Sequence, residues 1–295
     1  MKISIFVVCT SLILSTLTAH ADPRCVIDST DPYDPGVVMS KGKYQGQCMD
    51  ASEERAAVIL SEDSTQITFA NFWHEGKFWI ATVPLNGIDR GIFHTEYLES
   101  DIPMLKPAHV QMRFVMKNNF VVQLVPQAGK DKAVPPQTIN DLLLSIEYMA
   151  PRGVEYDLIP GELKAFKIAY TFFSAQAQVD FVKEDVAAGD GPDTLNQYEL
   201  KLSGEQLGAV FREAVHESFD YSYDHSYDTL IRNCATRLFN VLDLSLVYQT
   251  KVKPFKITIL NILDPVAKPS LKALQDRNIL DTTVTLPTFN QEYGL

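Results

Sequence analysis

The chain has 295 residues, of which 46% are hydrophobic, and its formal net charge at pH 7 is −11. A chain of this length and composition can bury a large core, in one domain or in two tightly joined ones. The acidic balance argues against nucleic-acid binding through phosphate contacts, and it gives no electrostatic attraction towards anionic lipid surfaces.

The N-terminus has the pattern of an export signal. Met1 and Lys2 precede an apolar run over residues 3–17, and Ala19, His20 and Ala21 form a small-x-small cleavage pattern. A membrane anchor is the alternative, but the run is shorter than the roughly 20 residues that span a bilayer. We therefore expect a signal peptide at residues 1–21, cleavage after Ala21, a periplasmic protein and no transmembrane segment in the mature chain.

Three cysteines remain after cleavage. Cys25 and Cys48 bracket a stretch rich in Asp, Pro and Gly, which has little apolar periodicity and would gain from a covalent link. We predict a Cys25–Cys48 disulfide in an N-terminal extension over residues 22–66. Cys234 is then a lone thiol, which in an oxidising compartment is buried, paired between molecules or chemically used.

Residues 67–127 are predicted to form strands. Apolar and polar residues alternate over residues 109–127, which indicates a hairpin that turns at residues 117–119. A two-residue turn would set Phe114 against Gln123, whereas a three-residue turn sets it against Val122 and keeps the apolar face intact. The second register is therefore expected, and it places His109 opposite Gln127.

The second half is predicted to be more helical. A short apolar helix is expected at residues 139–149, followed by strands at residues 166–173 and 198–202. A capping-box pattern at Ser203 starts a helix, and another helix begins near Asn233. The predicted fold class is α+β, an antiparallel sheet with packed helices.

Cys234 would lie in the first turn of the helix that begins near Asn233. Backbone N–H groups are unpaired there and the helix dipole is positive, so a thiolate is stabilised and an oxyanion can be received. Arg232 and Arg237 add positive charge. The alternative is that Cys234 is a small hydrophobic residue at a helix start.

A nucleophilic thiol needs a base, and the predicted hairpin indicates His109. The Gln127 carbonyl would accept from one ring nitrogen and leave the other to take the thiol proton. Histidine before cysteine along the chain is a circularly permuted order relative to papain-like folds. A strand-borne histidine can also be only a hydrogen-bonded polar residue.

Two stretches resemble the Lnb N-terminal periplasmic domain, a bacterial envelope family. They are Ala108-His109 at the start of a strand, and residues 227–238, where Tyr227 and Asn233 match the motif around the cysteine. The resemblance covers most of residues 67–243 and implies a papain-like domain, which we extend over residues 67–295 with a C-terminal helical extension.

The resemblance implies acyl transfer, since lipoprotein N-acyltransferases of this family use a cysteine and a histidine to pass an acyl chain from a lipid to an amino group. By position, Cys234 would be the nucleophile, His109 the base and Gln127 its partner, where the family pattern has an acidic residue. Asn233, Tyr227, Arg232 and Arg237 would contact the substrate, a lipid or lipoprotein, and no cofactor is expected. This chain lacks the membrane-embedded portion of the acyltransferases.

Other functions stay open. An envelope peptidase or amidase would use the same chemistry, and a binding protein could keep a papain-like shell without turnover. A metal could be held by a cluster of acidic and imidazole side chains: His216, Glu217, Asp220, Asp224, His225 and Asp228. Apolar residues within 251–263 (Phe255, Ile257, Ile259 and Leu260) could contact an acyl chain or a membrane surface, but such a stripe more often packs on the core.

Overall fold

The computed structural model describes residues 22–97, 108–154, 165–188, 194–228, 231–248, 251–256 and 267–295. The predicted signal peptide, residues 1–21, therefore lies outside the described residues. The part of the apolar stretch 251–263 that follows residue 256 also lies outside them.

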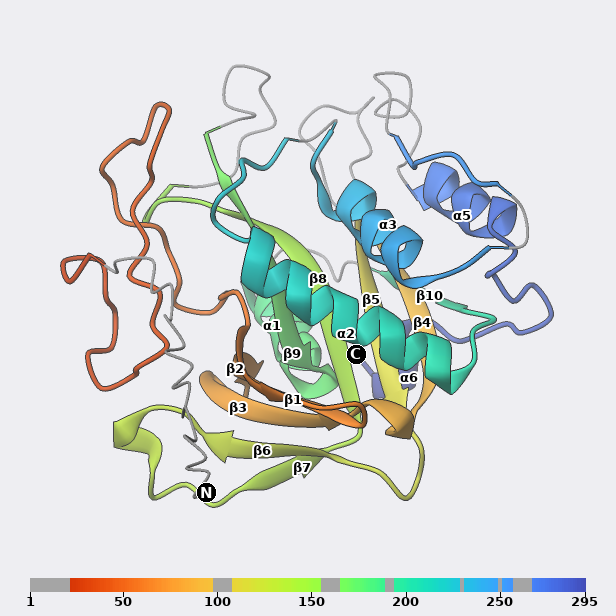
Figure 1. Cartoon of the computed structure of the whole chain (residues 1–295), viewed down its shortest axis with the longest axis horizontal. Coiled ribbons are helices and arrows are strands. Elements are labelled where there is room, and N and C mark those ends of the chain that lie inside the picture. Colours follow the sequence, from red (N-terminus) through yellow and green to blue (C-terminus); the bar gives the residue numbers. More distant parts are fainter. Residues whose placement is uncertain are drawn as a thin grey trace, which may run out of the picture.

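One large, mostly antiparallel sheet organises the protein (Figure 1). Its main path runs in the order β10-β4-β5-β8-β9-β2-β3-β6-β7, and β1 pairs with β2 beside this path. The single parallel pairing among the described strands joins β2 and β9. The strands are β1 (Val58–Glu62), β2 (Gln66–His74), β3 (Lys77–Pro84), β4 (Ile88–Tyr97), β5 (Ala108–Met116), β6 (Val122–Pro126), β7 (Gln137–Ile139), β8 (Asp141–Met149), β9 (Lys167–Ser174) and β10 (Leu195–Glu199).

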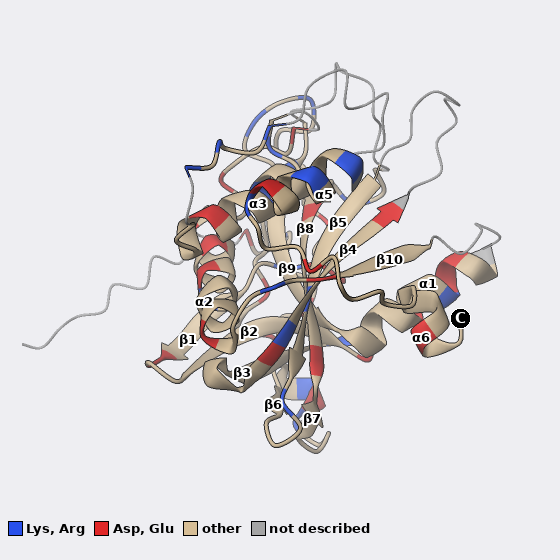
Figure 2. Ribbon diagram, turned by 90° about the vertical axis from the view of Figure 1, so that its right-hand side faces the viewer, with Lys and Arg blue, Asp and Glu red and all other residues tan. Residues whose placement is uncertain are grey.

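Helices cover both faces of the sheet (Figure 2). On one face lie α2 (Gly204–Tyr221) and α3 (Cys234–Ser245), which pack against β4, β5, β8 and β9. On the other lie α1 (Ala175–Ala188) and the short α6 (Phe289–Tyr293). A further helix, α5 (Ala267–Asp276), contacts β4 and β5. The prediction of a mixed α+β chain with an antiparallel sheet is confirmed.

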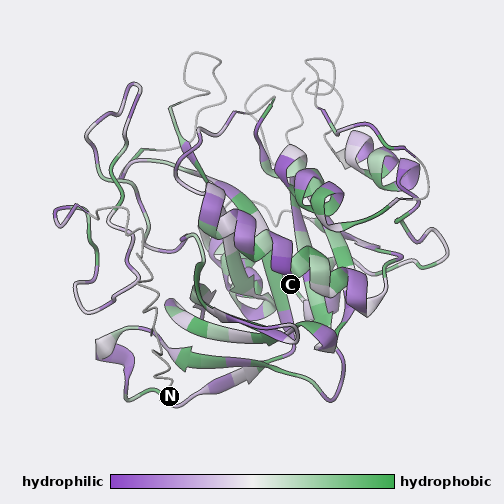
Figure 3. Ribbon diagram, in the orientation of Figure 1, coloured by the Kyte–Doolittle hydropathy of each residue, from purple (hydrophilic) through white to green (hydrophobic). Residues whose placement is uncertain are grey.

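Each face of the sheet has its own hydrophobic core. The larger core lies under α2 and α3, where the ring centroids of Phe114 and Phe211 are 5.1 Å apart. The smaller one joins α1, Leu143 of β8 and Phe289 of α6. Hydrophobic residues accordingly run through the central strands in Figure 3, whereas α2 alternates between hydrophilic and hydrophobic positions. Central strands must therefore be apolar on both sides.

The predicted hairpin over residues 109–127 is wrong. The strand β5 pairs with β4 and β8, while β6 pairs with β3 and β7, so four strands separate β5 from β6 in the sheet. The alternation of apolar residues located both strands correctly, but alternation says nothing about which strand is the neighbour. The partner of His109 in the β4 register is Glu96, and Gln127 is not opposite it.

The predicted helix at residues 139–149 is also wrong, because this segment is β8. Its residues Leu142 to Ile146 are all buried, since the strand is covered on both faces of the sheet. A continuous apolar run of this length fits a central strand as well as a buried helix. This correction matters for the site, because β8 lies directly beside β5.

The capping patterns in the sequence predicted the starts of α2 and α3 correctly. Ser203 caps α2 and Asn233 caps α3, and each forms a capping box with the residue three positions later. The strand predicted at residues 166–173 is β9, and the one predicted at 198–202 begins earlier, as β10. Side-chain capping uses only neighbours along the chain, so it can be read from sequence.

The N-terminal segment is held together by covalent and ionic links and packs on the larger core. The predicted Cys25–Cys48 disulfide is confirmed. Met39 and Met49 belong to the larger core, and the buried Arg55 forms ion pairs with Asp31 at 2.7 Å and with Asp34 at 3.0 Å. Among the helices that the structure describes, none is long and apolar enough to cross a membrane.

Candidate active site

Cys234 is the first residue of α3 and the free cysteine among the described residues. Its side chain is buried, with 5% of its surface exposed. The Asn233 side chain accepts from the amide of Thr236, at 2.9 Å. The helix itself offers no partner for the amides of Cys234 and Ala235, so both are suited to receive an oxyanion.

His109 is the second residue of β5, the strand against which α3 packs. The residues Val110 and Met112 belong to the core under α2 and α3. Alternation along the strand turns His109 towards the opposite side, with Gln111. Its ring is nevertheless close enough to the Cys234 thiol for the two side chains to interact.

The partners of His109 on the other side of its ring come from β8. Its Nε2 lies 2.7 Å from the Ser145 hydroxyl and 3.1 Å from the Glu147 carboxylate. The Ser145 hydroxyl donates its proton to Glu147, so its oxygen accepts from Nε2–H of His109. This arrangement places the proton on Nε2 and leaves Nδ1 as the nitrogen that can take the thiol proton.

The charges of this cluster are strongly coupled. Burial by itself disfavours the imidazolium of His109, but the Glu147 carboxylate and Cys234 outweigh it, so the pKa of His109 is raised well above its ordinary value. The pKa of Glu147 is lowered, because His109 and Ser145 together outweigh its burial. Cys234, His109 and Glu147 thus have the arrangement that a nucleophile, a base and an acidic group orienting the base would need.

Sequence reasoning did not find Glu147. The signal was a single acidic residue, two positions after a serine, in the otherwise apolar stretch at residues 142–149. On a helix, two residues spaced in this way do not face each other. On a strand, Ser145 and Glu147 share one face. The β5–β8 register pairs Met112 with Leu144 and, continued three residues further, sets His109 opposite Glu147.

Gln127 does not contact this cluster. Its side chain accepts from the amide of Asn71 and donates to the carboxylate of Asp31 and to the carbonyl of the Asn71 side chain. It therefore holds the N-terminal segment to the bulge in β2, where Asn71 has a φ of 71°. The role of orienting His109, predicted for Gln127, belongs to Glu147.

Asn233 and Tyr227 belong to the segment that leads into α3 and Cys234. Asn233 is 3% exposed and acts as the N-cap of α3, so its first role is to set the helix start. The ring of Tyr227 packs edge-on against Tyr148, and its backbone amide donates to Phe166. Of the two, Asn233 positions the Cys234 backbone. A contact of either with substrate stays a prediction.

Arg237 and Arg232 differ in what surrounds them. The Arg237 guanidinium is ion-paired with Glu217, donates to the Tyr170 hydroxyl at 2.6 Å, and lies 3.9 Å from the Tyr221 ring centroid. Its charge is thereby neutralised inside the protein. Arg232 exchanges two backbone hydrogen bonds with Asp228, which closes the turn before α3.

The acidic and imidazole side chains considered as a metal site contact different partners. His216 lies 2.8 Å from Glu62, Glu217 binds Arg237, and the His225 ring stacks on Tyr221. Within the described ranges no group of three or more His, Cys, Asp or Glu side chains has a metal-binding arrangement.

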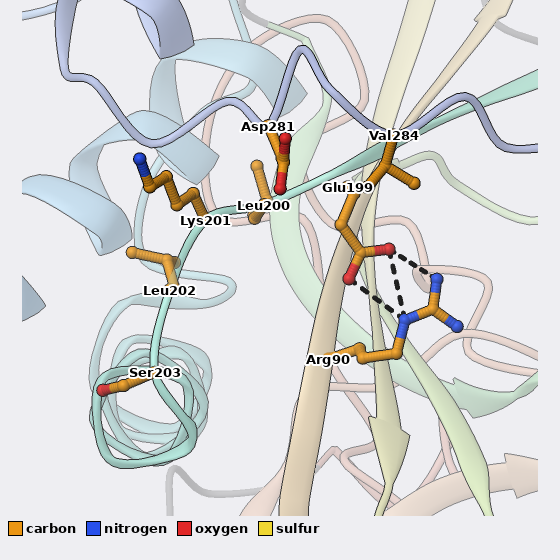
Figure 4. A pocket seen from close by; sticks show the side chains of 8 residues that line it. All are labelled: Arg90, Glu199, Leu200, Lys201, Leu202, Ser203, Asp281 and Val284. Carbon is orange, nitrogen blue, oxygen red and sulfur yellow. Dashed lines mark hydrogen bonds and ion pairs between the residues drawn. The ribbon is translucent and has the colours of Figure 1, made fainter.

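Two cavities were compared with the position of the site. One of about 220 Å³ is lined by His109 and Glu147. A larger one, of about 460 Å³, lies elsewhere, between β10 and the segment after α5, where Arg90 and Glu199 pair with each other (Figure 4). The smaller cavity is the relevant one, because it reaches the base and its acidic partner.

The apolar stretch at residues 251–263 is described only as far as residue 256. Phe255 stacks on Phe239 of α3, with ring centroids 4.3 Å apart, so this residue packs on the core. Ile257, Ile259 and Leu260 lie outside the described residues.

Comparison with protein families, with curated proteins and with solved structures found no match to this chain.

Proposed function

We propose that the protein is a cysteine-dependent acyltransferase or hydrolase that acts on an ester or amide carbonyl. The observation that carries this proposal is the position of His109, whose ring interacts with the Cys234 thiol on one side and with Glu147 on the other. A nucleophile, a base and an acidic group that orients the base are the components of thiol catalysis. Their order along the chain fits a circularly permuted papain-like fold.

The first step forms a thioester. His109 takes the thiol proton, the Cys234 sulfur attacks the carbonyl carbon, and the amides at the start of α3 receive the oxyanion. The imidazolium then gives its proton to the leaving alcohol or amine as the carbon–oxygen or carbon–nitrogen bond breaks. Glu147 stabilises the imidazolium during both transfers.

The second step resolves the thioester. An amine or a water molecule gives a proton to His109 and attacks the same carbon, and the carbon–sulfur bond breaks to restore the thiol. An amine makes the protein a transferase, and water makes it a hydrolase. The resemblance to the Lnb domain favours a lipid or lipoprotein as substrate.

The compartment we propose is the periplasm, after removal of residues 1–21. A disulfide between Cys25 and Cys48 supports this location, since such bonds persist in oxidising compartments. A peripheral contact with the membrane would bring the site to a lipid substrate. An envelope peptidase or amidase is the second candidate, because the same three side chains would serve it.

Covalent labelling tests the proposal. The mature protein is treated with a lipid-like and a peptide-like acyloxymethyl ketone, and adducts are located by mass spectrometry. We expect labelling at Cys234, none in Cys234→Ala, and much slower labelling in His109→Ala. His216→Ala is the matched control, because His216 is 40% exposed and pairs with Glu62. Equal labelling of wild type and His109→Ala would overturn the assignment, and the faster probe indicates the substrate class.

A further inference from the structure

The end of α3 and the chain that follows it form a basic region in an acidic protein. Residues 244–275 contain five lysines and one acidic residue, although the net charge of the whole chain is −11. Lys251, Lys253 and Lys256 are all exposed, and among the described residues none of the three forms an ion pair. Because salt screens charges that are more than about 8 Å apart, this positive charge acts locally whatever the rest of the chain carries.

Three contacts hold this region on α3. Phe255 stacks on Phe239 of α3. Arg277, directly after α5, forms an ion pair with Asp243 of α3 at 2.6 Å and donates to the backbone carbonyl of Lys253 at 3.2 Å. The lysine-rich segment is therefore fixed to both helices, which lie side by side at one end of the molecule (Figure 2).

Two large apolar side chains are exposed in the same region. Leu244, in the last turn of α3, is 57% exposed, and Val247, two residues after the end of this helix, is 95% exposed. The ring centroid of Tyr248 lies 5.8 Å from the Arg277 guanidinium, so both ends of this stretch are held at one arginine. A single exposed apolar residue is common on protein surfaces, but apolar side chains set among lysines are typical of segments that bind at a membrane interface.

We propose that this region binds the anionic phospholipid surface of a membrane. The lysines would lie among the lipid phosphates, and the two apolar side chains would enter the interface beneath them. The exposed aliphatic groups favour a lipid over a nucleic acid or another soluble polyanion, because only a lipid offers them an apolar phase. The inference deepens the proposed function, and it rests on that function in assigning a lipid-linked substrate to the site.

We call this region the basic surface, and it consists of Leu244, Val247, Lys251, Lys253, Lys256 and Lys272. Its lysines differ in how much they contribute. The Lys272 side chain is 73% exposed on α5, but it pairs with Asp276 at 2.8 Å, so part of its charge is neutralised. The three lysines between residues 251 and 256 therefore carry most of the attraction, and they are the residues to change.

Binding through the basic surface would bring the candidate active site close to the lipid. Cys234 is the first residue of α3, and Leu244 lies in its last turn. A helix of this length spans about 18 Å, so the thiol would lie within roughly that distance of the headgroups. A substrate that is itself anchored in the membrane would thus be concentrated near the thiol, which favours a lipid or lipoprotein over a soluble peptide.

Sedimentation of the mature protein with lipid vesicles tests the basic surface. The vesicles are made of phosphatidylcholine, with and without phosphatidylglycerol. We expect binding to be at least about tenfold tighter with phosphatidylglycerol and to weaken as salt is added. The triple variant Lys251→Gln, Lys253→Gln, Lys256→Gln should bind at least about tenfold more weakly, since each lysine near an anionic membrane contributes about fivefold. Val247→Ser should weaken binding about threefold.

A matched triple variant separates the basic surface from the net charge. Lys130→Gln, Lys132→Gln, Lys183→Gln removes the same charge from exposed lysines elsewhere and should retain most of the binding. Equal losses in the two triple variants, or equal binding to both kinds of vesicle, would overturn the basic surface. Unchanged binding of Val247→Ser would do so too, because it would indicate a site for polyanions in general. Without vesicles, the peptide-like probe should label Cys234 equally in all these variants, so absent vesicle binding with normal labelling counts against the basic surface alone.

Discussion

The Glu147 carboxylate lies 3.1 Å from Nε2 of His109, and the two residues come from neighbouring strands that are both central in the sheet. A strand fixes the direction of its side chains more rigidly than a loop does, so the ring has little freedom to turn. The imidazole is thereby held with its other nitrogen towards Cys234. This geometry makes the role of Glu147 testable by an isosteric change.

Glu147→Gln should lower the rate of Cys234 acylation by about 10²-fold or more, which is the lower range of general acid–base contributions. The amide preserves the shape of the side chain but no longer stabilises an imidazolium. The rate of probe labelling measures this effect directly. Gln127→Ala is a useful comparison, since Gln127 lies across the sheet from His109, and a loss of labelling as large as that of Glu147→Gln would contradict the site.

The same substitution should change the pH dependence of labelling. In the native protein the pKa of His109 is raised, with Glu147 as the main favourable cause against burial, so the imidazolium persists to higher pH than in a free histidine. Without the carboxylate this pKa falls. The alkaline limb of the labelling rate should therefore move to lower pH in Glu147→Gln, and a limb that stays in place would show that another group carries the titration.

Glu54→Gln should stabilise the protein, increasingly so as the pH rises above 4.5. Burial and Glu147 raise the pKa of Glu54 in the folded state, so the folded protein binds a proton that the unfolded chain releases near its ordinary value of 4.5. Each increment of pH above that value then costs stability until the folded-state pKa is passed. Urea unfolding at several pH values measures this, and the two proteins should coincide at pH 3.5, where Glu54 is protonated in both states. An advantage for wild type at pH 7 would contradict the placement of Glu54.

The residues of the site differ in how far sequence could predict them. Cys234 and its capping residue Asn233 were predictable, because a capping box depends on four consecutive residues. His109 was also predicted, but for a wrong reason, since the register that singled it out does not exist. Glu147 could not be found, because its importance comes from the pairing of β5 with β8.

The strands were easier to locate than to arrange. Alternation located β5 and β6, yet their order in the sheet depends on contacts between residues far apart in sequence. For β8 the local pattern itself was ambiguous, because a strand buried on both faces has no alternation. Because β8 was expected to be a helix, the prediction contained neither Glu147 as the acidic partner of His109 nor the correct order of the strands.

Loss of the Cys25–Cys48 disulfide should lower the free energy of unfolding by about 3 kcal/mol, from the entropy of closing a loop of this size. The two cysteines are 23 residues apart, and the chain that follows them supplies Glu53, Glu54 and Arg55 to the cavity. Denaturation of the Cys25→Ala, Cys48→Ala double variant with and without a reducing agent measures the loss, and only the wild-type protein should respond to reduction.

Gln178→Leu should raise the stability of the ligand-free protein by about 1 kcal/mol, since it removes a buried oxygen that has no donor and fills a similar volume. Gln178→Ala is the control, because it removes the same oxygen but leaves a void and should be destabilising. Thermal unfolding of the three proteins distinguishes the cases, and a clear loss of stability in Gln178→Leu would contradict the prediction, because the amide would then form contacts that outweigh its unpaired oxygen.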